Sequence, residues 1–330
     1  LLRADVAFQG ALHRGNEPKI QPPAEVRHFI ADIRKHPEEV ASWLDWHTFD
    51  AIVDWVVYTP EDAQCDVELF QGRVGQFVFI SSAAAYQRPV QHYLIREDTP
   101  LANPFWEYAR HKIACEGLFM NAYRDSGFPV TIVRPSYTYG PTSFPLCVNS
   151  REHPYTVADR IRRGKDIIVP GDGTSLWSVT YHTDFAEGLL GLLGYSPAVG
   201  HSFHITSDEV LTWDQIYGEL GRALGMEPRL VHLPSDLIAA AEPQRYGSLI
   251  GDKSCSVVFD NSKIKKIVPG LQPKVNWAGG VRRILDWYHA DPRRCTVDEP
   301  ANARWDRLLT LYRRCLQDAG NLADAEKNHS

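Results

Sequence analysis

The sequence predicts an α/β fold built on a doubly wound parallel sheet, with a smaller C-terminal domain that covers the substrate. Short apolar runs alternate with helical segments through the first half of the chain, and parallel strands need such crossover helices between them. One run, FVFI at residues 77–80, is apolar at every position, as in a strand buried on both faces. Ligands bind at the carboxyl ends of such strands, so we expect a site there.

The first half of the chain contains the segments expected to form the sheet and its crossover helices. Helix starts are marked by capping residues and early prolines, for example Thr59-Pro60 before an acidic pair. The apolar run at 51–57 is interrupted only by Asp54, which needs a polar partner if it is buried. We expect strands at residues 10–12, 28–33, 51–57 and 77–80 and before Arg134-Pro135, and helices that start at Pro37, Thr59 and Asn103, the last with Asn103 as N-cap.

The second half is expected to form a smaller mixed region. Thr212 and Gln215 have the spacing of a capping box, whereas residues 234–256 follow no regular pattern. We expect strands at 167–170, 177–181, 201–205 and 229–233, and helices at 157–163, 184–193, 212–225, 277–289 and 303–317.

Composition excludes several classes of protein. The 330 residues carry a formal net charge of −6, which disfavours a dedicated nucleic-acid binder. No apolar run approaches the roughly 20 residues of a membrane helix, and no signal-peptide pattern is present. The six cysteines are scattered without metal-binding spacing, so we expect reduced thiols, a cytoplasmic location and no metal site.

Two residues on one predicted helix indicate acid–base chemistry. Tyr108 and Lys112 are four positions apart, so they share a helix face. A phenol titrates near pH 10, and a neighbouring ammonium lowers its pKa toward neutrality. Ser82 lies just after the strand at 77–80 and is placed to hold the same substrate oxygen. Tyr-x-x-x-Lys alone is a weak signal, and the alternative is that Tyr108 lies in the core and Lys112 is solvated.

Taken in order, the motifs resemble those of the extended short-chain dehydrogenases/reductases, the NAD(P)-dependent epimerase/dehydratase family. In that family a strand ends in SSxxxY, which Ser81-Ser82 and Tyr86 match, and a helix carries YxxxK. The family's RPxxxYGP has its counterpart in RPSYTYGP at residues 134–141, and its Gly-Asp-Gly turn has one in residues 171–188. The resemblance covers most of the chain and implies a Rossmann-like fold.

The resemblance implies an NAD(P)-dependent oxidoreductase or epimerase. Tyr108 would be the general acid/base, Lys112 would lower its pKa and hold the nicotinamide ribose, and Ser82 would position the substrate oxygen. Hydride would pass between a substrate carbon and the nicotinamide. The implied division is a dinucleotide-binding domain of residues 1–140 plus 178–206 and a substrate-binding region of residues 141–177 plus 207–330.

The cofactor is expected to lie across several strand ends. In the family an Asp-hydrophobic pair meets the adenine, and Asp32-Ile33 matches it. The strand at 10–12 does not end in an acidic residue, which would bind the ribose 2′-hydroxyl of NAD. Arg14 is instead available to pair with the 2′-phosphate of NADP, so NADP is slightly favoured over NAD. The alternative is that Arg14 is a solvated turn residue. The predicted cofactor-binding residues are Arg14, Asp32, Ile33, Val56, Val57, Tyr108, Lys112, Pro135 and Tyr137.

The chain departs from the family pattern in three places. No GxxGxxG turn opens the sequence, so we expect weak dinucleotide binding and an open sheet edge near Val53 and Ile80. The strand after the Gly-Asp-Gly turn holds Trp177 where nucleotide-sugar members often carry an arginine, which weakens the case for a UDP- or GDP-sugar. Alanines follow Ser82 in place of an acid pair, which disfavours 4,6-dehydration.

The substrate is expected to be a small polyhydroxylated or otherwise polar alcohol or carbonyl compound. Aromatic side chains offer such rings apolar faces with polar tips. For Trp106 and Trp177, burial in the core is the alternative. We expect no membrane contact, and a homodimer is the assembly that we expect if the chain associates with itself. The predicted substrate-binding residues are Ser82, Tyr86, Trp106, Phe144 and Trp177.

A non-catalytic or RNA-associated binding protein on the same fold is the alternative function. Some relatives in chloroplasts resemble this sequence and are associated with RNA, and the missing glycine-rich turn favours a role without catalysis. The presence of Ser82, Tyr108 and Lys112 and the acidic net charge favour an enzyme. Nucleic acid is therefore the less favoured partner.

Overall fold

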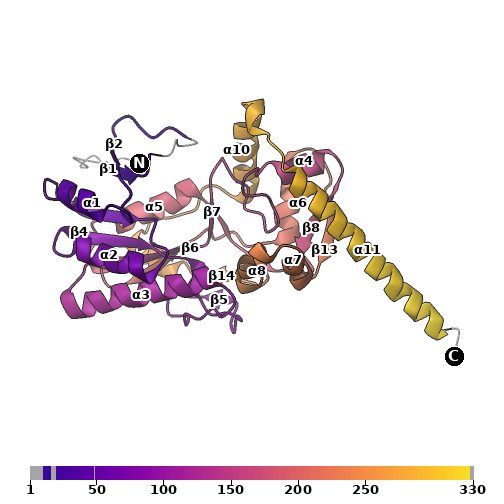
Figure 1. The fold of residues 1–330 in the computed structure, drawn as a ribbon, viewed down its shortest axis with the longest axis horizontal. Coiled ribbons are helices and arrows are strands. Elements are labelled where there is room, and N and C mark those ends of the chain that lie inside the picture. The colour runs from indigo at the N-terminus through magenta and orange to yellow at the C-terminus, as the bar shows by residue number, and fades with distance from the viewer. Residues whose placement is uncertain (1–9, 16–19, 48, 328–330) are drawn as a thin grey trace.

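The computed structural model describes residues 10–15, 20–47 and 49–327, except for the side chains of residues 322–327. Figure 1 shows a sheet-containing body formed mainly by the first half of the chain, beside a second body from which the last helix projects. The sheet of the first body is parallel and has helices on both faces, which confirms the predicted fold class. Among the described residues, no helix is long and apolar enough to cross a membrane.

Strands and helices alternate in the first body as predicted. Its strands are β1 (Gly10–His13), β2 (Arg27–Ile30), β3 (Phe49–Asp54), β4 (Val74–Ile80), β6 (Val130–Pro135) and β11 (Ser202–Ile205). Its helices are α1 (Pro37–Leu44), α2 (Pro60–Phe70), α3 (Glu107–Ser126), α5 (His182–Leu192) and α9 (Ser262–Ile267), with the 3₁₀ turns η1 (Ala83–Ala85) and η2 (Ser196–Ala198).

Four parallel strands form the main sheet in the order β11-β6-β4-β3. In this register Phe79 of β4 lies opposite Asp54 of β3. Successive side chains of a strand point to opposite faces. Phe77 and Phe79 therefore pack with residues of α2 and α3, while Val78 and Ile80 pack with residues of α5 and α9. The sheet thus lies between two helical layers, and the ends of β3, β4 and β6 open at one edge, where the predicted site lies.

Strand β3 lies at the edge of this sheet. In the described part of the chain it pairs only with β4, and β1 and β2 form a separate parallel pair. The prediction of a buried strand at 51–57 is wrong in this respect, because residues 51–53 are half-buried, the strand ends at Asp54 and Val56 is 41 % exposed. The predicted open edge is found near Val53 but not near Ile80, which is buried on a central strand. The start of the sequence, where a glycine-rich turn was sought, lies outside the described residues up to residue 9.

Helix α3 starts later than predicted. Its first residue is Glu107, and Trp106 occupies the N-cap without a capping side chain. Asn103 is not the cap, because its side-chain amide donates to the carbonyls of Ala84 and Gly251 at 2.9 and 2.7 Å. Asn103 therefore ties the segment before α3 to two other parts of the fold.

The second body combines short strands with helices around a large aromatic core that includes the buried Trp213 and Trp277. The strands are β5 (Leu94–Ile95), β7 (Tyr137–Tyr139), β8 (Asp166–Pro170), β9 (Leu176–Trp177), β10 (Val179–Tyr181), β12 (Leu211–Thr212), β13 (Arg229–Leu233) and β14 (Val258–Phe259). They pair as β7-β10, β8-β13 and β14-β5 in parallel and β9-β12 antiparallel. The helices are α4 (Thr156–Arg162), α6 (Trp213–Ala223), α7 (Ser235–Ala241), α8 (Tyr246–Ser248), α10 (Trp277–His289) and α11 (Glu299–Lys327), with the 3₁₀ turns η3 (Pro243–Arg245) and η5 (Pro292–Arg294).

The segment 234–256, for which the sequence showed no pattern, folds into short helical turns. It contains α7, η3, α8 and a π-helical turn, η4 (Leu249–Lys253). Gly247 packs closely on the ring of Trp106, since a Cβ on this residue would lie 2.1 Å from that ring. This segment therefore reaches the start of α3, beside the predicted site.

Helix α11 begins in the core of the second body and then leaves it. Trp305 and Leu308 are buried, whereas Leu316 is 55 % exposed. Between them, Arg313 forms an ion pair with Asp166 of β8. Figure 1 shows the remainder of the helix extending away from both bodies to the C-terminal end.

The predicted division into two domains stays a prediction. All four strands of the main sheet fall within residues 1–140 and 178–206, the part expected to bind the dinucleotide.

Candidate active site

The two predicted catalytic hydroxyls meet where β4 ends and α3 begins. Ser82 follows β4 and starts η1, where its hydroxyl accepts a hydrogen bond from the backbone N–H of Ala84 at 3.1 Å. Tyr108 lies in the first turn of α3, and the Ser82 side chain is close enough to the phenol to lower its pKa. The fold therefore brings these two groups to one point at the carboxyl edge of the sheet.

Lys112 lies one turn further along α3, and at 1 % exposure it is not the solvated lysine of the alternative interpretation. Its ammonium donates to the carbonyls of Val57 and Ile80 at 2.6 and 2.8 Å, so it connects the ends of β3 and β4. The ring centroids of Tyr58 and Tyr108 lie 5.1 and 5.8 Å from the same nitrogen. Burial lowers the pKa of Lys112 to about 8, because the charged form is poorly solvated there.

The prediction that Lys112 lowers the pKa of Tyr108 is wrong for this arrangement. Burial is the largest effect and raises the pKa of the phenol; the Ser82 side chain opposes this rise, and Tyr58 and Asp252 add to it. The ammonium of Lys112 is held by backbone carbonyls instead of the phenol oxygen. Tyr108 is therefore kept protonated at neutral pH, the state in which a general acid donates its proton.

The residues predicted for the adenosine end surround one arginine that the sequence analysis missed. Ile33 is buried, and the half-buried Asp32 accepts a hydrogen bond from the backbone N–H of Arg34 at 3.1 Å. The guanidinium of Arg34 binds Asp54 at 3.0 Å and Asp66 at 2.5 Å. Asp54 thus has the partner that its burial requires. Arg34 fixes the loop that carries Asp32 to the end of β3 and to α2.

The other predicted cofactor residues lie at neighbouring strand ends. Arg14 is exposed in the turn after β1, and Val56 is exposed beside Val57 at the end of β3. Pro135 and Tyr137 are half-buried where β6 leads into β7, and the Tyr137 hydroxyl donates to the carbonyl of Leu146 at 3.2 Å. The exposure of Arg14 fits both a phosphate contact and a solvated turn residue.

Three of the predicted substrate-binding residues belong to the core, so the predicted lining is wrong at these positions. Tyr86, Phe144 and Trp177 are 0, 4 and 2 % exposed. The Tyr86 hydroxyl is hydrogen-bonded to Nδ1 of His204 at 3.0 Å, and the Trp177 indole donates to the carbonyl of Lys253 at 3.2 Å. Protein groups occupy both the faces and the polar tips of these side chains, so no substrate-binding surface is left on them.

Trp106 is the predicted aromatic residue that remains beside the site. It is half-buried, and its ring centroid lies 4.8 Å from that of Tyr108. Asp252 and Lys253 of the η4 turn approach the same place, since Asp252 acts on the pKa of Tyr108 and the Lys253 ammonium lies 5.9 Å from the Trp106 ring centroid. No sequence pattern pointed to this pair, because both residues lie in the segment 234–256.

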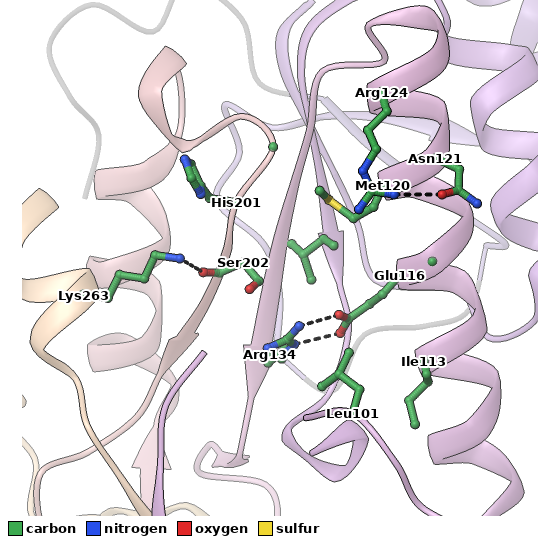
Figure 2. A pocket seen from close by; sticks show the side chains of 13 residues that line it. Leu101, Ile113, Glu116, Met120, Asn121, Arg124, Arg134, His201, Ser202 and Lys263 are labelled. Carbon is green, nitrogen blue, oxygen red and sulfur yellow. Dashed lines mark hydrogen bonds and ion pairs between the residues drawn. The ribbon is translucent and has the colours of Figure 1, made fainter. Parts of the chain in front are cut away.

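A cavity of about 400 Å³ lies away from these residues. Figure 2 shows it between α3, β6, β11 and α9, with the Arg134 guanidinium bound to the Glu116 carboxylate. None of the predicted site residues is among the described residues that line it. The candidate active site around Tyr108 is therefore identified by the chemical groups of its residues and not by this cavity.

One group of described residues has the spacing of metal ligands. His36, Glu38 and Glu39 lie at the start of α1 with ligand atoms within 4.8 Å of one another. All three are exposed, and exposed acidic groups are common without an ion. They support no metal assignment.

Known proteins match this chain across the same region. Residues 64–205 match the NAD dependent epimerase/dehydratase family. A trifunctional UDP-glucose 4,6-dehydratase/UDP-4-keto-6-deoxy-D-glucose 3,5-epimerase/UDP-4-keto-L-rhamnose-reductase of Arabidopsis thaliana is 24 % identical over 225 residues, which cover 67 % of this chain and 30 % of that protein. The chain spans 30 to 57 % of the length of the curated dehydratases that it matches first.

A second relative matches over a longer stretch. The chloroplast stem-loop binding protein of 41 kDa b, also of Arabidopsis thaliana, is 27 % identical over 302 residues, which cover 89 % of this chain and 72 % of that protein.

Solved structures agree on the fold. The crystal structure of dTDP-glucose 4,6-dehydratase from Bacillus anthracis in complex with NAD superposes with a TM-score of 0.65 at 18 % identity and covers 83 % of both chains. At this identity the likeness concerns the fold alone. The matched family segment, however, runs through Ser82, Tyr108 and Lys112, the residues that the fold assembles into one site. Over residues 64–205 the chain is therefore similar to the NAD dependent epimerase/dehydratase family.

Proposed function

We propose that the chain is an NAD(P)-dependent oxidoreductase or epimerase in which Tyr108 transfers a proton to or from a substrate oxygen. The observation that carries this proposal is the placement of the Tyr108 phenol beside the Ser82 side chain at the end of β4, close enough for Ser82 to act on the pKa of the phenol. An alcohol or carbonyl oxygen placed there meets both hydroxyls. Because burial raises the pKa of Tyr108, the resting site is set to act as an acid on a carbonyl.

Lys112 supports this chemistry from the same face of α3. Two of its three ammonium hydrogens are taken by the carbonyls of Val57 and Ile80, so one donor remains for a ligand hydroxyl. With a pKa of about 8, the amine is mostly charged at pH 7. Lys112 therefore supports the chemistry by holding a ligand hydroxyl beside Tyr108, and not by shifting the pKa of the phenol.

The described residues fit the nicotinamide end of an NAD(P) molecule. The spare donor of the buried Lys112, beside the phenol of Tyr108, suits a ribose hydroxyl, and Val57 and Pro135 would border the ring. When bound, the cofactor supplies the hydride acceptor or donor. Within the described residues, no strand of the main sheet leads through a glycine-rich turn into a helix, so the phosphates have no such support there. The slight preference for NADP, through Arg14, remains part of the proposal.

The proposed substrate is a sugar-like or other polar alcohol or carbonyl compound. Trp106 presents a half-buried aromatic ring next to Tyr108, which suits the apolar face of a sugar. Relatives whose names specify UDP- and dTDP-sugars support this class by analogy. Dehydration is not proposed, because residues 83–85 after Ser82 are buried alanines that provide no carboxylic acid.

Substitution of Tyr108 by Phe tests the catalytic assignment. The change removes one hydroxyl, so NAD(P)H turnover on a confirmed substrate should fall by roughly 10²- to 10⁴-fold, the usual contribution of a positioned general acid. Tyr123→Phe is the matched control, since Tyr123 lies on the same helix and is 37 % exposed. Equal turnover by the Tyr108→Phe and Tyr123→Phe proteins would sink the assignment.

A second candidate is a non-catalytic or RNA-associated binding protein on the same fold. The observation in its favour is the match to the chloroplast stem-loop binding protein, which extends over 89 % of this chain. The formal net charge of −6 disfavours it, because phosphate contacts need a basic surface.

An RNA mobility-shift assay at two salt concentrations separates the two functions. Binding through phosphates weakens steeply as salt rises, by about 10³-fold or more between 50 and 200 mM for six or more contacts. A salt-sensitive shift that survives Tyr108→Phe favours the binding protein. Absence of a shift at low salt, together with turnover that needs Tyr108, favours the enzyme.

We also propose a homodimer in a reducing compartment such as the cytoplasm. All six cysteines are unpaired in the structure, which suits that environment. Sedimentation equilibrium of the purified chain tests the dimer.

A further inference from the structure

Helix α3 carries a second stripe of residues, on a different flank from Tyr108 and Lys112. Its members recur at intervals of three or four positions, which places them along one side of the helix. They all line the cavity of about 400 Å³ shown in Figure 2, and they are Ile113, Glu116, Gly117, Met120, Asn121 and Arg124. The helix that carries the candidate active site thus also forms one wall of a separate cavity.

The edge of the main sheet and helix α9 complete this cavity. Ile132 of β6 lies opposite Ser202 of β11 in the sheet, so the two residues share a face. Ile132 packs with residues of α3, so this is the face that α3 covers, and both residues line the cavity. Figure 2 shows Lys263 and His201 across the cavity from α3. Residues far apart in the sequence therefore enclose one space.

An ion pair between Glu116 and Arg134 forms a fixed part of the lining. The two side chains are buried, and the guanidinium donates to the carboxylate at 2.6 and 2.9 Å. The carboxylate also accepts from the Ser81 hydroxyl at 2.6 Å, and the guanidinium donates to the carbonyl of Glu97 at 3.0 Å. These two charges cancel, and their bonds hold this part of the cavity in shape.

Two further cations in the lining are not neutralised by the protein. Arg124 donates to the side-chain oxygen of Asn121 at 2.9 Å, and Lys263 donates to the carbonyl of Ser202 at 2.7 Å. Both acceptors are uncharged, and neither cation forms an ion pair within the described part of the chain. Each retains further N–H donors for a ligand. The lining therefore has a surplus of positive charge.

The acidic residue with the largest effect on Lys263 does not bind it. Burial lowers the pKa of Lys263, and Glu97 opposes this shift. The carboxylate of Glu97 accepts instead from the backbone N–H of His204 at 3.3 Å. A bound anion in the cavity would therefore supply the counter-charge that Lys263 lacks and would stabilise its ammonium form.

The cavity also offers an apolar surface. Its volume of about 400 Å³ lies within the range of small-molecule sites, about 300–1,000 Å³, which combine apolar walls with a few polar groups. The apolar side chains in the lining are those of Leu101, Ile113, Met120 and Ile132. A ligand that fits this lining has an apolar body as well as a negative charge.

We propose that this cavity binds an organic anion, a carboxylate or a phosphate on an apolar body, whose charge is compensated by Lys263 and Arg124. The site is separate from the candidate active site, and the inference does not rest on the proposed function. An organic anion gains both charge compensation and burial of its apolar part. Inorganic phosphate gains only the first of these, and a neutral ring compound gains only the second.

The two methionines of the chain provide a direct test of binding. Met120 lines the cavity, whereas Met226, after α6, does not. With ¹³C-labelled methionine methyl groups, phenyl phosphate or benzoate should shift the Met120 signal to saturation and leave the Met226 signal in place. The Met226→Leu protein assigns the two signals. No shift of Met120 with either anion, or equal shifts of both signals, overturns the proposal.

Two comparison probes show whether the charge and the apolar body both matter. The better of phenyl phosphate and benzoate should bind about 10-fold more tightly than benzyl alcohol or inorganic phosphate, as expected for one charge-assisted hydrogen bond. The tighter of the two organic anions identifies the group as a phosphate or a carboxylate. Equal affinity for benzyl alcohol, or for inorganic phosphate, overturns the proposal.

Charge-removing variants assign the effect to its position. Lys263→Gln and Arg124→Gln should each weaken binding of the organic anion about 10-fold and leave that of benzyl alcohol unchanged. Lys266→Gln on α9 and Arg110→Gln on α3 are the matched controls, because both residues are exposed and lie outside the cavity lining. Circular dichroism checks that all four proteins are folded. Full affinity in either cavity variant, or an equal loss in the controls, overturns the proposal.

Substitution of Tyr108 by Phe separates this cavity from the candidate active site. The Met120 titration should be unchanged in the Tyr108→Phe protein, whatever happens to turnover, because Tyr108 does not line the cavity. A loss of anion binding in Tyr108→Phe would place the probes in the candidate active site and overturn the proposal.

Discussion

The buried ammonium of Lys112 should make the stability of the folded protein depend on pH above neutrality. The pKa of Lys112 falls from 10.5 to about 8 on folding, because burial disfavours the charged form. Between these two values the unfolded chain binds more protons than the folded protein, so the free energy of unfolding rises with pH. The difference between 10.5 and about 8 corresponds to about 3 kcal/mol.

A comparison of the wild type with Lys112→Met isolates this effect from all other titrating groups. The variant leaves the carbonyls of Val57 and Ile80 without their donor, which costs roughly 1–3 kcal/mol for each group but does not vary with pH. Urea denaturation from pH 7.5 to 10.5 should show the wild type gaining about 3 kcal/mol relative to Lys112→Met. Lys35→Met, at an exposed position, should show no such change. A constant difference between wild type and Lys112→Met over this range would refute burial as the cause.

Two further predictions concern packing and buried charge. Glu116→Gln removes the charge that holds the buried Arg134 guanidinium at 2.6 and 2.9 Å. The free energy of unfolding measured by urea denaturation should fall by roughly 3–5 kcal/mol, because the guanidinium is left buried without its counter-charge. A fall of less than about 1 kcal/mol contradicts this. Gly280→Ala on α10 places a Cβ 1.8 Å from the Tyr139 hydroxyl, and should destabilise the protein by roughly 1–3 kcal/mol. Gly117→Ala on α3, with nothing within 4 Å, should instead stabilise it by roughly 0.5–1 kcal/mol, and equal shifts of the two melting temperatures are inconsistent with this reasoning.

The parts of the fold that depend on neighbouring residues could be predicted from the sequence. Thr59 and Thr212 cap their helices as expected, each in a capping box with the residue three positions later. The all-apolar run at 77–80 forms the inner part of β4. Such signals lie within one turn or one strand, so the sequence contains all that determines them.

Features set by distant residues could not be predicted. Tyr86 was expected to face a substrate, but its hydroxyl is taken by His204, which lies 118 positions away. The four-residue spacing of Tyr108 and Lys112 correctly put them on one helix face, but it contains no information about the carbonyls that hold the ammonium. Lys253 escaped notice because its position depends on an indole from β9 and another from α6.

The long helix α11 divides the chain into regions of unequal local stability. With 29 residues it is roughly 40 Å long, yet its last ion pair to the rest of the protein, among the described side chains, is that of Arg313 with Asp166. An isolated helical stretch of about a dozen residues is marginal in water, so the part beyond Arg313 should open and close without unfolding the rest. Amide hydrogen exchange along α11 should therefore change abruptly near that residue, with slow exchange around Trp305 and fast exchange after Leu316.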